Sequence, residues 1–199
     1  MRKPYVIGLT GSIGMGKTTT AKMFADAGIP VWDADAAVHR LYAPGGPAVE
    51  PIRSLHPDVV KHGEVDRAAL KSWISRDPTA LGRIEAIVHP LVAEDRARFV
   101  SDVAADIVVV DVPLLFETGA VDEVDAIVVV SAPPDTQKTR VLERGTMDSD
   151  TFETILAKQI PDEEKRKRAD YVIETNSLEG ARKQVQYVLN DIREKTANA

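Results

Sequence analysis

The sequence predicts an α/β fold with a doubly wound parallel sheet. Residues 107–111 and 126–130 are continuously apolar rather than alternating, as strands buried on both faces of a sheet tend to be. Helical patterns separate them from a first apolar run, 5–10, and a last one, 171–174. Strands that alternate with helices indicate parallel pairing through crossover helices. A chain of 199 residues, 44% hydrophobic, is long enough for one such domain with an inserted lobe.

The first strand leads into a glycine-rich loop. Residues 11–18 match the pattern G-x-x-x-x-G-K-[ST] completely, between an apolar strand and a helical pattern. The glycines let the backbone wrap around phosphate, so that successive N–H groups and the start of the helix face the anion. In such a P-loop, Lys17 reaches the β- and γ-phosphates and the Thr18 hydroxyl binds Mg²⁺. The ATP-binding residues expected here are Gly11, Gly14, Met15, Gly16, Lys17, Thr18 and Thr19.

The elements that follow are read from periodicity and turn residues. A helix is expected over 17–27 with Gly28 as its C-cap glycine, then a short strand over 29–33 and a helix from 34. From there to about Val103 the pattern is helical and shows no convincing strand. Asp66 and Asp77 are the expected N-caps in that stretch.

These patterns predict a single domain with a P-loop core that two stretches interrupt. The expected core covers about 1–33, 104–135 and 169–199. A helical lobe over about 34–103 is a natural place for an acceptor site, and a helical hairpin over about 136–168 is a natural place for a closing lid.

Composition narrows the classes of partner. Lys and Arg number 25 against 31 Asp and Glu, a formal net charge of −6, which argues against broad attraction to nucleic acid or to an anionic membrane. The absence of cysteine excludes disulfides and thiolate metal sites. No segment reaches the ~18 apolar residues of a membrane span, and the basic start lacks a signal cleavage site. We expect a soluble, cytoplasmic protein, either a monomer or a small homo-oligomer.

Two carboxylates are expected in one crevice, because ligands of open parallel sheets bind at the carboxyl ends of the strands. Asp33 closes the second strand and is the candidate general base for an acceptor hydroxyl. The alternative is that Asp33, or Asp35 beside it, is only an N-cap. Asp111 ends a Walker-B-like run and would lie near the metal on Thr18, although an ordinary strand-end acid would look the same.

Basic residues complete the candidate site. Arg140 and Arg144 are four apart, so a helix would place both on one face toward ATP phosphates; a solvated surface pair is the alternative. His39 and His89 are candidate substrate contacts, or ordinary structural histidines. Taken together, these residues predict an ATP-dependent phosphotransferase whose acceptor stays open. A switch GTPase is disfavoured, because the chain has no N-K-x-D and no D-x-x-G after its second strand.

Four segments in order narrow the acceptor: 10–19, 33–35 with His39, 87–90 with His89-Pro90, and 111–117, which reads Asp-Val-Pro-Leu-Leu-Phe-Glu. As a set they resemble the dephospho-CoA kinase family, over essentially the whole chain up to the strand 170–173. The resemblance implies transfer of phosphate from ATP, with Mg²⁺, to the 3′-hydroxyl of dephospho-CoA, the last step of coenzyme A synthesis. It also implies that Asp33 acts on that hydroxyl and that Arg140 contacts ATP phosphates. The substrate-binding residues expected are Asp33, Asp35, His39, His89, Leu114, Leu115 and Glu117.

The lid departs from the family pattern. Many relatives carry an Arg close before an Ala-x-Gln segment, and residues 154–159 lack one here. The substitute is left open among Arg144, Lys158 and the run 165–168. A nucleoside or nucleotide-monophosphate kinase, with the same loop and lid but another acceptor lobe, is the alternative function.

Overall fold

The computed structural model describes residues 3–197 and divides the chain into two compact units. Among the described residues, the first unit joins residues 3–32 to residues 103–197, and the second is Asp33–Asp102. Each unit contains a hydrophobic core of its own.

A parallel sheet forms the centre of the first unit. It consists of β1 (Tyr5–Thr10), β2 (Val31–Asp33), β5 (Ile107–Asp111), β6 (Ala126–Ser131) and β7 (Tyr171–Glu174), in the order β2-β5-β1-β6-β7. β1 pairs in parallel with both β5 and β6, and β6 pairs in parallel with β7. The predicted parallel α/β sheet is confirmed, and its strands begin and end within two residues of the expected positions.

Helices α1 (Lys17–Asp26) and α9 (Leu178–Ala197) contact each other and cover one face of this sheet. Their apolar side chains join alternate strand residues in one buried cluster, which includes Ile7, Val109, Val130, Phe24 and Leu189. On the other face, the segment after β5 packs so closely that a Cβ on Gly8 would lie 2.9 Å from Leu115 Cδ2. Both faces are therefore covered, as the continuous apolar strands require.

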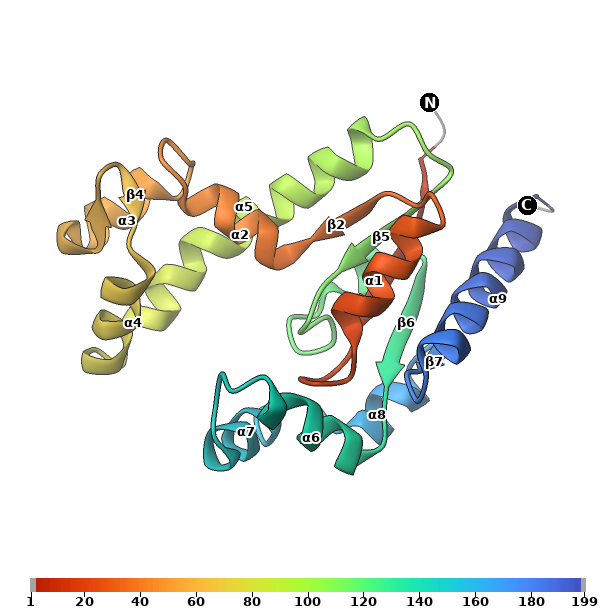
Figure 1. Ribbon diagram of the computed structural model, residues 1–199. Coiled ribbons are helices and arrows are strands. Elements are labelled where there is room, and N and C mark those ends of the chain that lie inside the picture. Colours follow the sequence, from red (N-terminus) through yellow and green to blue (C-terminus); the bar gives the residue numbers. More distant parts are fainter. Residues whose placement is uncertain (1–2, 198–199) are drawn as a thin grey trace. The chain divides into compact units, whose positions relative to one another are not determined.

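Three helices follow β6 in the region expected to be a lid: α6 (Pro134–Glu143), α7 (Ser149–Leu156) and α8 (Asp162–Lys167). Figure 1 shows α6 and α8 beyond the arrowhead of β6. Asp148 caps α7 by accepting a hydrogen bond from the N–H of Thr151. The expected hairpin of helices is thus three short helices.

The second unit contains α2 (Ala34–Tyr42), α3 (Val49–Leu55), α4 (Arg67–Arg76) and α5 (Ala80–Asp102). Its core lies among these helices, with Leu41, Ile52, Leu70 and Ile84 buried. Asp66 caps α4 as predicted, since its carboxylate accepts from the N–H of Ala69 at 2.9 Å. Asp77 instead ends α4 and accepts from Thr79, which forms a turn ahead of α5.

One element of the second unit was not predicted. A small antiparallel hairpin pairs β3 (Val60–Lys61) with β4 (Glu64–Val65), so the expectation that this stretch contains no strand is wrong. His62 and Gly63 both adopt positive φ, 51° and 81°, as a two-residue type I′ turn requires. Histidine is not among the usual residues at that turn position, so the sequence signal was weak.

Within residues 3–197, no helix combines the length and the apolarity that crossing a membrane would need.

Candidate active site

The loop between β1 and α1 has the backbone of an anion cradle. Gly14 and Gly16 adopt φ of 78° and 94°, which favour glycine, and Gly16 is the N-cap of α1, where no side chain caps the helix. The first N–H groups of α1 are therefore not capped by a side chain. The loop is also closely packed, because a Cβ on Gly14 would lie 2.6 Å from Val141 of α6.

Two glutamine side chains form hydrogen bonds with the backbone of the phosphate loop. Gln137 of α6 donates its Nε2 to the carbonyl oxygen of Ile13 at 2.7 Å, and its side chain is buried. Gln159 accepts from the N–H of the same Ile13 at 3.1 Å. Both polar groups of this loop residue are thus bound by side chains of the 134–168 segment, which fixes the loop conformation.

The two charged residues of the phosphate-binding motifs meet. Lys17 Nζ forms an ion pair with Asp111 Oδ1, and Asp111 is only 2% exposed at the end of β5. The sequence predicted Asp111 near the metal on Thr18 and Lys17 at the phosphates; the direct contact between the two side chains was not predicted. Thr18 and Thr19 are exposed in the first turn of α1.

A pocket of about 350 Å³ adjoins the phosphate loop. Gly16 and Thr19 line it on the side of the loop, and Asn176 and Ser177 line it beyond β7. Both arginines predicted to act together, Arg140 at the end of α6 and Arg144 at its C-cap, also line this pocket. The prediction that Arg140 and Arg144 lie on the same side of this segment is confirmed.

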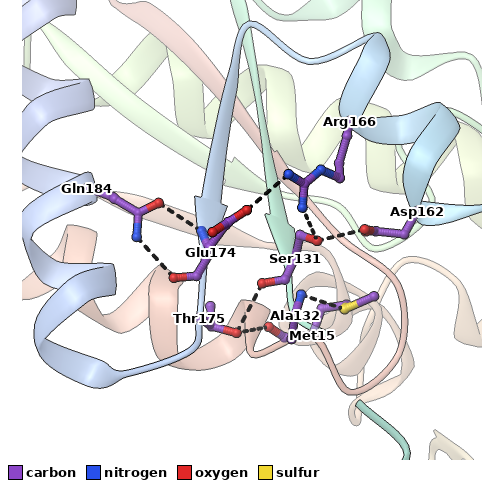
Figure 2. A network of polar contacts seen from close by, with 8 residues as sticks. All are labelled: Met15, Ser131, Ala132, Asp162, Arg166, Glu174, Thr175 and Gln184. Atoms are coloured by element: carbon purple, nitrogen blue, oxygen red, sulfur yellow. Dashed lines mark hydrogen bonds and ion pairs between the residues drawn. The ribbon is translucent and has the colours of Figure 1, made fainter. Parts of the chain in front are cut away.

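Thr175, the residue that follows β7, connects the pocket wall to the phosphate loop. Its hydroxyl donates to the carbonyl oxygen of Met15 at 2.7 Å and accepts from Arg140 Nη1 at 2.9 Å, while Arg140 Nη2 donates to its carbonyl oxygen at 2.6 Å. Figure 2 shows Thr175 between Met15 and Ser131, with the N–H of Ala132 donating to the sulfur of Met15. The loop and Arg140 are therefore held by one buried threonine.

Glu117 lies in a second, mostly buried ion pair. Its Oε1 is 2.8 Å from Lys165 Nζ of α8 and accepts from the N–H of Ile160 at 3.0 Å; Lys165 is fully buried. Burial raises the pKa of Glu117, but the contact with Lys165 and the Ile160 N–H together outweigh burial and hold this pKa below its usual value. Glu117 is therefore an ionised carboxylate bound by protein groups.

The apolar residues of the segment after β5 differ in exposure. Leu114 is 41% exposed, whereas Leu115 is fully buried against Gly8. The expected substrate contact by Leu115 is therefore corrected: its side chain packs in the core under the sheet. Phe116 is also buried, and the guanidinium of Arg168 lies 4.4 Å from its ring centroid.

Four predicted acceptor residues belong to the second unit. Asp33 begins it and caps α2, since its Oδ1 accepts from the N–H of Ala36 at 2.7 Å; the N-cap reading thus falls on Asp33 rather than on Asp35. Asp35 and His39 are exposed on α2, and His89 is exposed on α5. α2 and α5 pack against each other, so these side chains belong to one pair of helices.

The basic residues left open in the lid fall into two groups. Lys165 pairs with Glu117, Arg166 donates to Ser131 Oγ and pairs with Glu174, and Lys167 pairs with its helix neighbours. These three residues of the run 165–168 therefore form contacts with other side chains of the protein. Arg144 lines the pocket beside the loop and is the candidate for a nucleotide contact.

Sequence reasoning missed three residues that hold the site: Gln137, Gln159 and Thr175. Thr175 follows β7, so the rule that singled out Asp33 and Asp111 at strand ends also points to it. The glutamines carry no such signal, because only the packing of α6 and of the 157–160 turn against the loop brings them to Ile13.

The donor set around the loop fits magnesium bound mainly by phosphate. Among the described residues, no group of three or more His, Cys, Asp or Glu side chains could hold a metal ion alone. Mg²⁺ in phosphoryl-transfer sites takes one or two protein oxygens and completes its shell with phosphate and water. One hydroxyl, from Thr18, and one carboxylate, from Asp111, are a set of that kind.

Comparisons with known proteins agree with this architecture. A family model described as dephospho-CoA kinase matches residues 5–180. The dephospho-CoA kinase of Cereibacter sphaeroides is 58% identical over 197 residues, covering 99% of this chain and all of that protein. The dephospho-CoA kinase of Ruegeria pomeroyi is 59% identical and covers 95% of this chain and 96% of its own length.

Solved structures give the same fold. TT1252 from Thermus thermophilus superposes with a TM-score of 0.84 at 34% identity, covering 96% of this chain and 98% of that one. The dephospho-CoA kinase from Campylobacter jejuni gives a TM-score of 0.72 at 24% identity over 96% of this chain and 98% of that one, which supports the fold alone.

Proposed function

The chain belongs to the dephospho-CoA kinase family, and we propose that it transfers the terminal phosphate of ATP to the 3′-hydroxyl of dephospho-CoA, giving coenzyme A and ADP. The observation that carries this proposal is the family match over residues 5–180 together with a near-full-length relative at 58% identity. The phosphate loop and its pocket are the features of the structure that support it.

The nucleotide is proposed to bind at the loop between β1 and α1. Its phosphates would lie on the loop amides and on the N-terminal turn of α1, where peptide dipoles favour negative charge. The 350 Å³ pocket beside Gly16 and Thr19 would take the nucleoside, with Arg140 and Arg144 in its wall. In this arrangement Lys17 exchanges Asp111 for the β- and γ-phosphates.

Thr18 and Asp111 are proposed to hold Mg²⁺ with the phosphates, Asp111 directly or through water. The ion would neutralise charge that develops on the phosphate oxygens during transfer. Lys17 and the pocket arginines supply further positive charge. Most of the acceleration in such a reaction comes from alignment and charge stabilisation, because the transition state is loose.

Asp33 is proposed as the general base. Its Oδ1 caps α2, and its carboxylate would accept the hydroxyl proton as the acceptor oxygen bonds to the γ-phosphorus and the bond to ADP breaks. Asp35, His39, His89 and the exposed Leu114 are proposed to hold dephospho-CoA. Glu117 is proposed to act through its protein partners instead.

A coupled assay of ADP release tests the function. With ATP and Mg²⁺, dephospho-CoA should stimulate ADP release far more than any member of a panel of nucleosides and nucleoside monophosphates. Release without acceptor should be slow. Equal rates with a nucleoside monophosphate would show that dephospho-CoA is not the specific acceptor. Equal rates with and without any acceptor would contradict the proposed kinase activity.

A further inference from the structure

Two consecutive residues of the 134–168 segment contact two separate loops of the first unit. The Gln159 side chain accepts from Ile13 in the phosphate loop at 3.1 Å. The N–H of the next residue, Ile160, donates at 3.0 Å to Glu117 in the loop after β5. Because adjacent residues have Cα atoms about 3.8 Å apart, residues 159–160 form a short connection between the two loops.

Lys165 closes the arrangement from α8. Its side chain is 0% exposed, and its ammonium group lies 2.8 Å from the same Oε1 that Ile160 binds. In the described part of the chain, this ion pair is the contact that Lys165 Nζ makes with a polar group, while Glu117 Oε2 and Asp162 Oδ1 are buried without a hydrogen-bond partner. Replacing a buried ion pair by apolar residues of similar volume is often neutral or stabilising in proteins, so a buried pair is weak evidence for a purely stabilising role.

We propose that Gln159, Lys165 and Glu117 are positioning residues that set the loop after β5 against the phosphate loop. The effect on catalysis rests on the proposed function, in which one loop binds ATP and the other carries Leu114 toward the acceptor. The three residues, called the brace here, act through the backbone of Ile13 and of residues 113–117. None of them needs to touch a substrate.

Amide hydrogen exchange tests the brace without any substrate. Lys165→Met should speed exchange at Ile160 and across 114–119, and at Ile13, by about tenfold or more, because the bonds that protect these amides loosen. Lys167→Met is the matched control: it lies on the same helix, is exposed and pairs with exposed Glu163 and Glu164. Unchanged exchange at Ile13 in Lys165→Met would overturn the coupling between the loops.

A neutral double variant separates positioning from folding. Lys165→Met with Glu117→Gln removes both buried charges together, so the protein should recover stability relative to either single variant. Exchange at Ile13 should nevertheless stay fast, because the ion pair is absent. If the double variant recovers both stability and wild-type exchange, the pair is only structural and the proposal fails.

Kinetics then test the consequence. Each single variant should lower kcat/KM for dephospho-CoA by about tenfold, and the double variant should lie within about threefold of the singles, because residues that act as a unit are not additive. Gln159→Leu should raise KM for ATP, and Gln159→Glu, which keeps the accepting oxygen, should restore most of it. A much larger loss in Glu117→Gln than in Lys165→Met, with additive effects, would indicate direct substrate binding and contradict the brace.

The outcomes distinguish the two proposals. A wild-type protein inactive with dephospho-CoA would refute the proposed function, while the exchange experiment would still decide the brace. An active wild type with unchanged exchange and kinetics in all three brace variants would refute the brace alone.

Discussion

Two lysine–carboxylate pairs, Lys17–Asp111 and Lys165–Glu117, have their carboxylates on the same stretch of chain, at the end of β5 and in the loop after it. Lys17 is 16% exposed and begins a helix at the phosphate loop, whereas Lys165 is 0% exposed inside α8 packing. The first lysine can exchange its partner for a phosphate. The second has no route to solvent, and Glu117 is held by a backbone N–H as well.

This difference in burial and in backbone contacts indicates that the two ion pairs respond differently to ligand binding. At the phosphate loop, Lys17 lies near solvent and Asp111 is the proposed ligand of Mg²⁺. Binding of ATP with Mg²⁺ is therefore expected to break this pair. In the brace, Glu117 is also bound by the N–H of Ile160 and Lys165 is fully buried, so this pair is expected to persist. Variants that remove one charge at a time separate these behaviours.

The largest effect is expected at the exchangeable pair. Lys17→Met should reduce kcat/KM for ATP by about 10²- to 10³-fold, because a positive group aimed at the transferring phosphoryl group is lost. Steady-state kinetics with dephospho-CoA as acceptor measure this loss. The double variant with Asp111→Asn should regain stability but no activity, and recovered turnover would contradict the role of Lys17.

A third carboxylate, Asp33, sharpens the comparison because one of its oxygens has a structural partner. Asp33→Asn should lower kcat by about 10²-fold, since the amide cannot accept the hydroxyl proton. Asparagine caps helices as well as aspartate, so the start of α2 should be retained and ATP affinity should not change. Single-turnover rates and ATP titration measure the two effects, and near-normal turnover would remove Asp33 as the base.

The Lys165–Glu117 pair should change how the free energy of unfolding depends on pH. The pKa of Glu117 lies below its ordinary value of ~4.3, so the pair stabilises the fold above that pH and the contribution is lost as pH falls through the lower, folded value. In Lys165→Met, burial remains without the counter-charge and raises this pKa, so stability should instead fall as pH rises.

Urea unfolding measures the difference between these two proteins. Lys165→Met should cost about 3–5 kcal/mol at pH 7, because breaking a buried pair leaves an uncompensated charge, and the cost should shrink toward pH 4.5. The neutral double variant should show little of this pH dependence. A cost that does not vary with pH would mean that Glu117 is not the group responsible.

The smallest effect is expected at Thr175, which supports the nucleotide side. Thr175→Val should raise KM for ATP by about tenfold, since Arg140 loses one acceptor and the Met15 carbonyl loses its donor. Thr175→Ser keeps the hydroxyl and serves as the control, with KM near that of wild type. If valine and serine behave alike, the hydroxyl does not position the pocket.

The phosphate loop and the strands were predictable because they depend on short stretches of sequence. The glycine pattern at 11–16, Lys17 and the preceding apolar run specify the strand, loop and helix locally. The runs at 107–111 and 171–174 are strands as predicted. The hairpin at 60–65 escaped because its turn uses histidine at positive φ.

The partners of the charged residues were not predictable in the same way. Leu114 and Leu115 are adjacent and chemically identical, yet one is exposed and the other packs under Gly8. Likewise, Lys165 belongs to residues 163–168, whose mixed charges are typical of an exposed helix. Lys165 is the one residue of these six that is fully buried. Which neighbour lies inside depends on how α8 and the loop after β5 meet, across 48 residues of sequence.

The sequence by itself determined the parallel sheet, the phosphate loop and the family, because each follows from periodicity or from residues that are close together in the chain. The tertiary structure alone decided that Glu117 faces Lys165, that Gln159 holds Ile13, and that Thr175 joins Arg140 to the loop. The physical reason is that ion pairs and hydrogen bonds between distant segments depend on side-chain packing, which no local pattern encodes.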